Sequence, residues 1–289
     1  MTGKFALITG CGAGGIGQAL AYGLHDKEDP DVYRGYTVIA TLLPHEDDTH
    51  LTARNVKIYR VDGTSEKSVK ELHTAPETHA NGRLDILINN AYTMPAVDTD
   101  AAQVEKMFRV NVFGPMQMVH VFHRMLIAGQ GVIVNIGSIG GICPYVYGSS
   151  YNASKSALIH WGNTLRVEML PFGVRVVNVI SGEVATNILK TDFNRSLPEG
   201  SVYGPLADAF RQHVRRTPNT MTPEEYAKGV IEEIVKPSPK AWFFYGNAPT
   251  LVWFFSTFLP HTAFDWLFYR WFNLEKLAIR FREEKIGGL

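Results

Sequence analysis

The chain has 289 residues, of which 45% are hydrophobic and 19% are charged, which is typical of a folded globular protein and excludes a disordered or repetitive one. Its 28 Lys and Arg residues balance 28 Asp and Glu residues, so the charge gives no reason to expect nucleic acid as a partner. Two cysteines without metal-ligand spacing predict neither a disulfide framework nor a metal site. The N-terminus enters an apolar run at once and lacks a signal-peptide pattern, so we expect a cytoplasmic protein.

The first 26 residues follow the pattern strand, glycine turn, helix. Residues 5–9 are apolar, residues 10–17 are rich in glycine, and a helical pattern follows. Glycine allows positive φ and a close approach of the backbone to a pyrophosphate, and the helix N-terminus offers unpaired N–H groups to the anion. A tight turn without a ligand has the same glycine pattern. Because the turn lies next to the first strand, we favour a dinucleotide site made by Gly10, Gly12, Gly15, Ile16 and Gly17.

The end of the second predicted strand, residues 36–42, bears on the choice of cofactor. In dinucleotide folds an acid at this position binds the adenosine ribose, whereas a basic residue accepts a 2′-phosphate. Leu42 and Leu43 stand here instead. The missing acid favours NADP, while the acids at positions 46–48 pull towards NAD, so NAD is not excluded.

Polar residues follow two further apolar runs, residues 56–61 and 84–88. Asp62 is placed to reach the adenine, or else it is a turn acid that caps the next helix. Asn90 and Ala91 follow the fourth strand, at the sheet edge where ligands bind in doubly wound folds. Asn111 lies within a predicted helix over about residues 100–125, where asparagine indicates either a kink or a polar role.

A fifth strand, residues 132–136, leads to the residues that indicate chemistry. Ser138 follows this strand, and Tyr151 lies four residues before Lys155, a spacing that places both side chains on one face of a helix. A cation beside a buried tyrosine favours phenolate and makes the phenol a candidate general acid or base. Each feature alone is common, but together they predict a catalytic site.

Taken in order, these motifs resemble the short-chain dehydrogenase/reductase family over about residues 5–247. The resemblance implies a single doubly wound, Rossmann-type parallel sheet of the α/β class and hydride transfer between a nicotinamide and a carbonyl or alcohol carbon. It implies that Tyr151 is the general acid, that Ser138 positions the carbonyl oxygen, and that Lys155 binds the nicotinamide ribose and lowers the tyrosine pKa. Asn111 would hold a water next to Lys155. Residues 181–186 match the segment that contributes Val184 and Thr186 to cofactor binding.

Several positions depart from the commonest form of that family. The Gly-Gly-Ile-Gly turn resembles that of fungal 1-acyldihydroxyacetone-phosphate reductases. Tyr92 replaces the glycine usual after Asn-Asn-Ala, Ser181 replaces a proline, and Leu43 stands where NADP-using members carry an arginine. We expect Tyr92 to influence the choice of substrate. We expect residues 183–220 to form a variable loop that closes over the bound substrate.

The sequence predicts two parts: a catalytic domain of residues 1–247 and an aromatic helical extension of residues 248–289. Charged and polar residues interrupt the apolar run of the extension, so it is not expected to span a membrane. One interpretation is amphipathic helices packed on the core or on a partner in a homo-oligomer. Others are a wall of the substrate pocket, or peripheral contact with an intracellular membrane or lipid droplet.

These features predict an NADP(H)-dependent reductase that acts on a hydrophobic ketone, either lipid-like or a secondary metabolite. The strand-end sequence Ala-Thr-Leu also fits a hydroxysteroid-type alcohol dehydrogenase. A third interpretation, based on the altered positions 43, 92 and 181, is a scaffold or non-redox catalyst that binds the cofactor.

Overall fold

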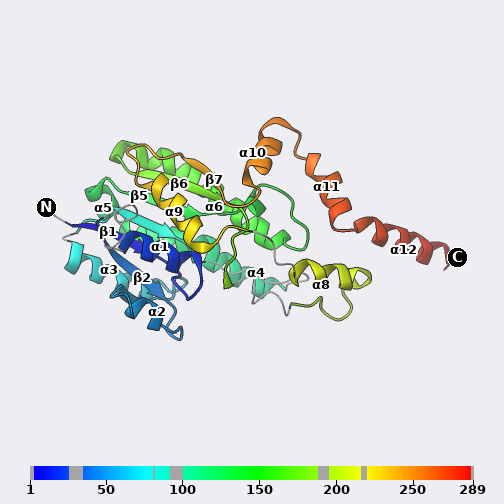
Figure 1. Ribbon diagram of the computed structural model, residues 1–289, viewed down its shortest axis with the longest axis horizontal. Helices are drawn as coiled ribbons and strands as arrows, with labels where there is room; N and C mark the ends of the chain where they lie inside the picture. Colours follow the sequence, from blue (N-terminus) through cyan, green and yellow to red (C-terminus); the bar gives the residue numbers. More distant parts are fainter. Residues whose placement is uncertain are drawn as a thin grey trace.

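A seven-stranded, fully parallel sheet forms the centre of the computed structural model, with the strand order β3-β2-β1-β4-β5-β6-β7 (Figure 1). The structure describes residues 3–25, 35–80, 82–91, 100–187, 195–215 and 220–287. The order runs outward in both directions from β1, which confirms the predicted doubly wound sheet. The strands are β1 (Lys4–Ile8), β2 (Tyr36–Leu42), β3 (Lys57–Arg60), β4 (Ile86–Asn89), β5 (Val132–Ile136), β6 (Arg175–Ser181) and β7 (Trp242–Tyr245).

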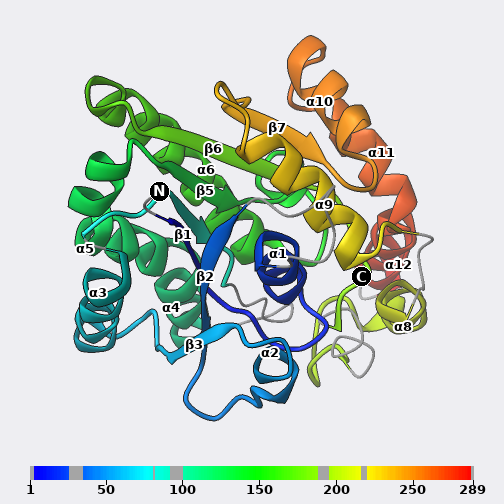
Figure 2. The same cartoon turned by 60° about the vertical axis from the view of Figure 1, so that its left-hand side comes forward.

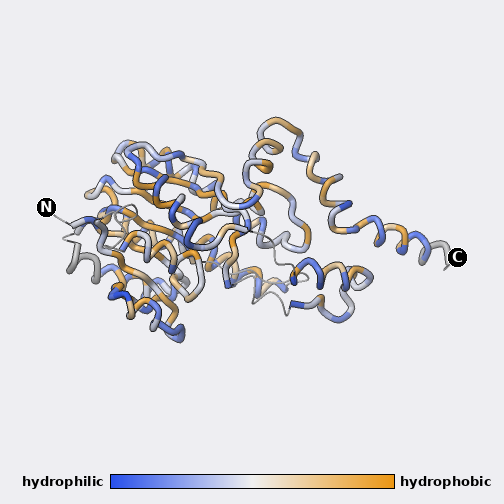
Figure 3. Tube along the Cα trace, viewed as in Figure 1, coloured by the Kyte–Doolittle hydropathy of each residue, from blue (hydrophilic) through white to orange (hydrophobic). Residues whose placement is uncertain are grey.

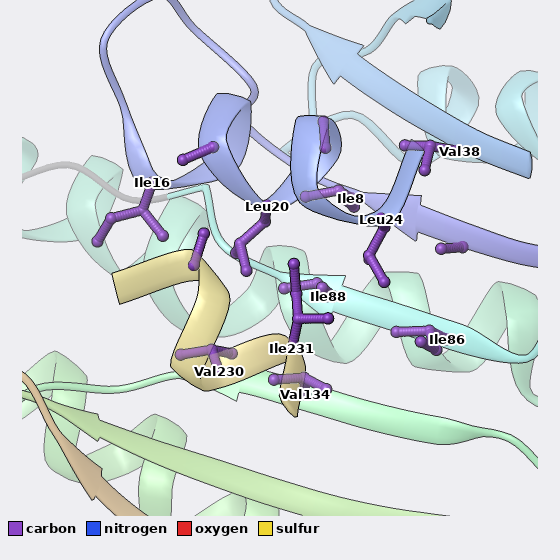
Figure 4. Close-up of a cluster of buried hydrophobic side chains, with 14 of the residues drawn as sticks. Ile8, Ile16, Leu20, Leu24, Val38, Ile86, Ile88, Val134, Val230 and Ile231 are labelled. Atoms are coloured by element: carbon purple, nitrogen blue, oxygen red, sulfur yellow. The ribbon is translucent and has the colours of Figure 1, made fainter. Parts of the chain in front are cut away.

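One face of the sheet is covered by α1 (Ile16–His25) and α9 (Pro223–Ile234). Figure 4 shows Leu20 of α1 and Ile231 of α9 directed at the sheet, where they meet Ile88 and Val134. Alternate residues of each strand contribute to this layer because successive side chains of a strand point to opposite faces. The helix α9 begins with a capping box at Thr222, as its Thr-Pro-Glu-Glu sequence predicts.

The other face is covered by α3 (Glu66–Ala80), α5 (Gly114–Gly129) and α6 (Ser149–Met169). Its core includes Leu7, Ile39, Leu87 and Ile133 from the strands, packed against Phe122 of α5. Figure 2 shows α3 and α5 on the side of the sheet opposite to α1. Two packed layers of helices therefore fix the carboxyl edge of the strands as a rigid surface.

The long helix expected over residues 100–125 contains an irregular turn. It consists of α4 (Ala101–Phe108), a π-helical turn (Arg109–Phe113) and α5. Because a π turn widens the helix by one residue and is frequent at functional sites, it agrees with the kink expected at Asn111. Short helical segments occur elsewhere in the chain: α2 (Thr49–Thr52) and 3-10 turns at Ile139–Gly141, Leu170–Phe172 and Gly204–Leu206.

The C-terminal extension consists of three helices, α10 (Pro249–Phe258), α11 (Ala263–Trp271) and α12 (Leu274–Gly287). They leave the sheet next to β7 and extend away from it (Figure 1), and hydrophobic residues continue along them (Figure 3). The helix α8 (Ala207–Arg215) lies on the same side of the molecule. No helix among the described residues is long and apolar enough to cross a membrane.

Three sequence features lie wholly or partly outside the described residues. Tyr92 is one of them, and so is most of the insertion expected over residues 27–35. The variable substrate loop is described except for residues 188–194 and 216–219.

Candidate active site

The predicted site residues come together at one edge of the sheet. The carboxyl ends of parallel strands lie at the same edge, so β1, β2, β4, β5 and β6 deliver their following residues to a common surface. The glycine turn follows β1, Ser138 follows β5 and Val184 follows β6. The fold therefore places a dinucleotide-binding turn and a candidate catalytic group on the same surface.

The glycine turn is built so tightly that side chains do not fit. Gly10 has a φ of +70°, a conformation that glycine adopts without strain. A Cβ atom on Gly17 would lie 2.3 Å from the carbonyl oxygen of Gly10 and 2.6 Å from Nδ2 of Asn90. The start of α1 is therefore pressed against the turn, and this arrangement fits the pyrophosphate site that the sequence predicts.

Asn90 and Thr9 hold the turn in place. The Asn90 amide donates to the backbone oxygens of Thr9 and Gly10, both at 2.9 Å. The Thr9 hydroxyl accepts hydrogen bonds from the backbone N–H groups of Asn90 and Ala91, at 3.0 and 3.1 Å. Asn90 Oδ1 is buried without a hydrogen-bond partner, so this end of the amide keeps an unused acceptor beside the predicted cofactor site.

At the predicted adenosine end, Leu43 is 39% exposed after β2. Its backbone N–H donates to Glu46 Oε2 at 2.7 Å, and its carbonyl oxygen accepts from Arg60 at 3.2 Å. Asp62 Oδ1 accepts from the backbone N–H and the hydroxyl of Thr64, at 2.9 and 2.7 Å. Asp62 thus forms the turn before α3, which is the structural alternative noted for it, and its role at the adenine remains a prediction.

The Ser138 hydroxyl lies close enough to the Tyr151 phenol to lower its pKa, although 13 residues separate the two in the sequence. Ser138 has extended backbone angles, and its hydroxyl also accepts from the backbone N–H of Gly140 at 3.1 Å. A Cβ atom on Gly140 would lie 3.4 Å from Ser138 Oγ and 3.5 Å from the Tyr151 ring. It would also lie 2.8 Å from Asn152 Oδ1, so the close approach of this turn to α6 requires glycine.

Lys155 is buried one helical turn after Tyr151, with 2% of its surface exposed. Its ammonium donates to the backbone oxygen of Ile136 at 2.9 Å and lies 5.9 Å from the centroid of the Tyr151 ring. Burial lowers the pKa of Lys155 to about 7. It raises the pKa of Tyr151 to about 12, and the hydrogen bond with Ser138 opposes this rise. The expected lowering of the tyrosine pKa is thus outweighed by burial, which keeps Tyr151 a protonated phenol at neutral pH.

Asn111 contacts the catalytic helix from the π turn. Its Nδ2 donates to Ser154 Oγ at 3.0 Å, and Ser154 Oγ donates to the backbone oxygen of Tyr151 at 2.7 Å. Asn111 is only 1% exposed. The structure therefore links the π turn to the backbone of Tyr151, whereas the water expected next to Lys155 remains a prediction.

The segment after β6 contributes a residue that the sequence analysis did not single out. Val184 forms a bridge with Met221, and Thr186 donates its backbone N–H to the oxygen of Val184. The next residue, Asn187, donates its amide to the oxygen of Ala13 at 2.9 Å and its backbone N–H to the oxygen of Gly14 at 3.2 Å. Asn187 thus closes the segment onto the glycine turn, and its position directly after Thr186 was the available signal.

An aromatic cluster lies next to the 3-10 turn that follows Ser138. We define it as the buried set Cys143, Tyr147, Phe210, Val214, Val252, Phe264, Phe268 and Phe272. Ile139, the residue after Ser138, packs against it. Tyr147 has a φ of +67° and a buried hydroxyl without a partner, and its ring meets Phe210 edge-on at 5.0 Å. The extension therefore packs against the loop that follows Ser138.

Comparison with known proteins gives the family. Residues 4–196 match the family model described as short chain dehydrogenase. The chain is 59% identical over 281 residues to the short-chain dehydrogenase RED1 of Pyricularia oryzae, covering 95% of this chain and 96% of that protein. It is 37% identical to an NADPH-dependent 1-acyldihydroxyacetone phosphate reductase of Schizosaccharomyces pombe, covering 80% and 78% of the two chains. A solved short-chain dehydrogenase from Streptomyces avermitilis has the same fold, with a TM-score of 0.73, 23% identity and 96% and 98% coverage.

The chain belongs to the short-chain dehydrogenase family and is an NAD(P)-dependent oxidoreductase. The glycine turn fits such a cofactor, because a Cβ atom on Gly10 or Gly17 would clash and Asn90 keeps an unused acceptor beside it. Among the described residues, no group of three His, Cys, Asp or Glu side chains is placed to hold a metal ion.

Proposed function

We propose that this enzyme reduces the ketone of a hydrophobic substrate with NADP(H), with Tyr151 as the general acid. The observation that carries the proposal is that the Ser138 hydroxyl, the Tyr151 phenol and the buried Lys155 lie together. The bound cofactor would supply the hydride. Gly10, Gly12, Gly15, Ile16 and Gly17 would hold it, together with Asp62, Asn90, Ala91, Val184, Thr186 and the ribose-binding Lys155.

The proton comes from this chain's own residues. Tyr151 is protonated at neutral pH because burial raises its pKa to about 12. Ser138 lies beside the same phenol, so both hydroxyl groups would donate to one carbonyl oxygen when a ketone binds between them. Lys155, whose pKa is about 7, exchanges protons readily near neutral pH and so suits the return of a proton to Tyr151.

Three observations support NADP(H) over NAD(H). The end of β2 carries Leu42 and Leu43 in place of the acid that binds the adenosine ribose. The guanidinium of Arg60 lies at this edge, bonded to the oxygen of Leu43. The S. pombe relative is named as NADPH-dependent.

Replacing Tyr151 with phenylalanine tests the reaction directly. We expect Y151F to lower the turnover of ketones by at least about 100-fold, because a positioned general acid contributes on that scale or more. Binding of NADPH, measured by the fluorescence of the reduced nicotinamide, should change little. The matched control is Y269F, which removes the hydroxyl of a 42% exposed tyrosine on α11, outside the glycine turn and the loop after Ser138. Full turnover in Y151F would rule out the proposed chemistry.

The aromatic cluster supports a hydrophobic substrate. Ile139 and Tyr147 connect the catalytic serine to a wall of phenylalanines contributed by α8 and α11. These phenylalanines are buried, so a ketone with an extended apolar body would contact the partly buried side chains around them, such as Ile142, Val146 and Tyr203. Apolar area buried in this way stabilises binding by roughly 25 cal/mol per Å². A lipid-like or secondary-metabolite ketone fits this description.

We also propose that the outer face of the extension contacts a membrane surface. Trp266 and Trp271 are 66% and 59% exposed, and Phe258 is 61% exposed. Trp and other aromatic side chains are favoured at membrane interfaces. Phe264 and Phe268 occupy the buried face of the helix. Trp271 stacks on Phe268 with ring centroids 5.9 Å apart, yet more than half of its surface remains exposed.

Flotation with vesicles of phosphatidylcholine and phosphatidylserine tests this contact. We expect the unaltered chain to float and the W266S/W271S variant to float less. The matched control is F172S, which removes an exposed aromatic ring at a 3-10 turn after α6. If the unaltered protein stays in the dense fraction, or if both variants float alike, membrane contact through α11 is wrong.

A further inference from the structure

The adenosine end of the cofactor site contains an acid that strand-end patterns do not identify. Glu46 lies four residues after the last residue of β2, in the loop before α2. Its Oε2 accepts the backbone N–H of Leu43 at 2.7 Å. Its Oε1 lies 3.3 Å from the position that a Cβ atom on Gly12 would occupy. One carboxylate therefore spans the space between the glycine turn and the end of β2.

That space is where the adenosine ribose is expected. In doubly wound folds the pyrophosphate lies on the glycine turn and the ribose lies at the end of the second strand. A 2′-phosphate in this space would need N–H donors and a positive charge. The backbone N–H of Leu43 is such a donor, and its hydrogen bond goes to the Glu46 carboxylate.

Arg60 fixes the backbone of the loop that carries Glu46. The guanidinium donates to the backbone oxygens of Leu43 and Glu46 and to the carboxylate of Asp48. His50 bonds the oxygen of Cys11 at 2.9 Å and ties the loop to the glycine turn. Because the backbone is fixed on both sides, the Glu46 side chain is the part that has to move when a ligand enters.

We propose that Glu46 is an internal anion that occupies the 2′-phosphate position and sets the balance between NADP(H) and NAD(H). The phosphate must displace the carboxylate from the Leu43 N–H, and the two anions repel each other near the surface. NAD(H) carries a hydroxyl at that position and meets no such repulsion. Glu46 therefore weakens NADP(H) binding selectively, and this inference rests on the proposed dinucleotide site.

Titration of the full-length protein with NADPH and with NADH, followed by nicotinamide fluorescence, tests the proposal without any ketone. In E46Q the side chain keeps its size and loses its charge. We expect E46Q to bind NADPH at least about tenfold more tightly, a change of the size expected from removing one like-charge contact near the surface. NADH binding should change by less than about threefold.

The matched control is D47N, because Asp47 is an exposed acid in the same loop that bonds Thr49 and does not face Gly12. It should leave both affinities unchanged. Equal changes in D47N and E46Q would mean that only the net charge of the loop matters, which would overturn the proposal. So would an E46Q variant with an unaltered NADPH affinity, or one that loses NADH affinity about tenfold because the carboxylate held the ribose diol.

The unaltered protein separates this inference from the proposed cofactor. If it binds NADH more tightly than NADPH and E46Q still gains NADPH affinity selectively, the role of Glu46 stands and the proposed preference for NADP(H) fails. If it prefers NADPH and E46Q changes nothing, the proposed cofactor stands and the role of Glu46 fails.

Discussion

We call the carboxyl edge of the sheet, where the predicted site residues lie, the cofactor edge. It lies beside the aromatic cluster, but the two regions are built from different interactions. At the cofactor edge, directional hydrogen bonds fix each group: Thr9 and Asn90 hold the glycine turn, and Lys155 is bonded to Ile136. In the aromatic cluster, contacts between rings dominate, such as the edge-on pair of Tyr147 and Phe210. Hydrogen bonds require fixed geometry, whereas ring packing accepts many shapes of similar volume.

This difference matches the tasks of the two regions. Hydride and proton transfer need reacting groups held within fractions of an ångström, so the edge is specified by glycines and buried polar groups. The proposed hydrophobic substrate would need complementary apolar surface, which the partly buried residues around the aromatic cluster would supply. We therefore expect substitutions at the edge to affect the reaction, and substitutions in the cluster to affect stability and the choice of substrate.

The largest expected effect on stability concerns the charge buried at the cofactor edge. Burial lowers the pKa of Lys155 from 10.5 to about 7, so folding disfavours its charged form. Below pH 7 the whole cost is present, and it disappears as the pH rises towards 10.5, because over this range the unfolded chain binds a proton that the folded chain lacks. A shift of this size corresponds to roughly 4–5 kcal/mol.

The K155M variant keeps the aliphatic stem and removes the charge. We expect it to unfold at a higher urea concentration than the unaltered protein at pH 6, in the absence of cofactor. The gap in unfolding free energy should shrink by roughly 3 kcal/mol by pH 9.5. The control is K240M, the replacement of an exposed lysine, which should give a small difference in unfolding free energy. A gap for K155M that does not depend on pH would contradict the buried-charge explanation.

Sequence patterns predicted where the glycine turn, Ser138 and Tyr151 lie in the fold because the signals for them are local, whereas their roles remain predictions. The glycines beside residues 5–9, the serine after a strand and the spacing of Tyr151 and Lys155 each follow from a few neighbouring residues. The role of Glu46 depends instead on the path of a loop that brings it to Gly12, 34 positions away in the sequence (46 − 12). No local pattern describes such a path.

Local sequence patterns also fail to predict where the C-terminal extension packs. Phe264, Phe268 and Phe272 are spaced four residues apart, which predicts one apolar face of a helix. Nothing in that spacing indicates that the face packs against the loop after Ser138 or against α8, since both contacts join distant parts of the chain. The interpretation of packing therefore describes the buried face of α11, whereas membrane contact through its exposed face remains a proposal.

The aromatic cluster provides the next prediction, because its ring packing has a measurable strength. Phe268 is 6% exposed and lies within ring-contact distance of Phe264, Phe272 and Tyr145. Removing a buried phenylalanine ring costs about 3–5 kcal/mol in a closed core, and we expect the lower end here because the cluster lies at the side of the molecule. In F268A, amide hydrogen exchange should therefore accelerate in α11 and in residues 143–147, whereas exchange in β1, β4 and β5 stays slow.

The matched control is W266A on the outer face of the same helix. Trp266 is 66% exposed, so its loss should change stability by no more than about 0.5 kcal/mol and leave the exchange rates of residues 143–147 unaltered. Equal acceleration in both variants would mean that α11 depends only on its own helix formation. Faster exchange throughout the sheet in F268A would show instead that the cluster and the cofactor edge unfold as one unit, and the division between the two regions would then be wrong.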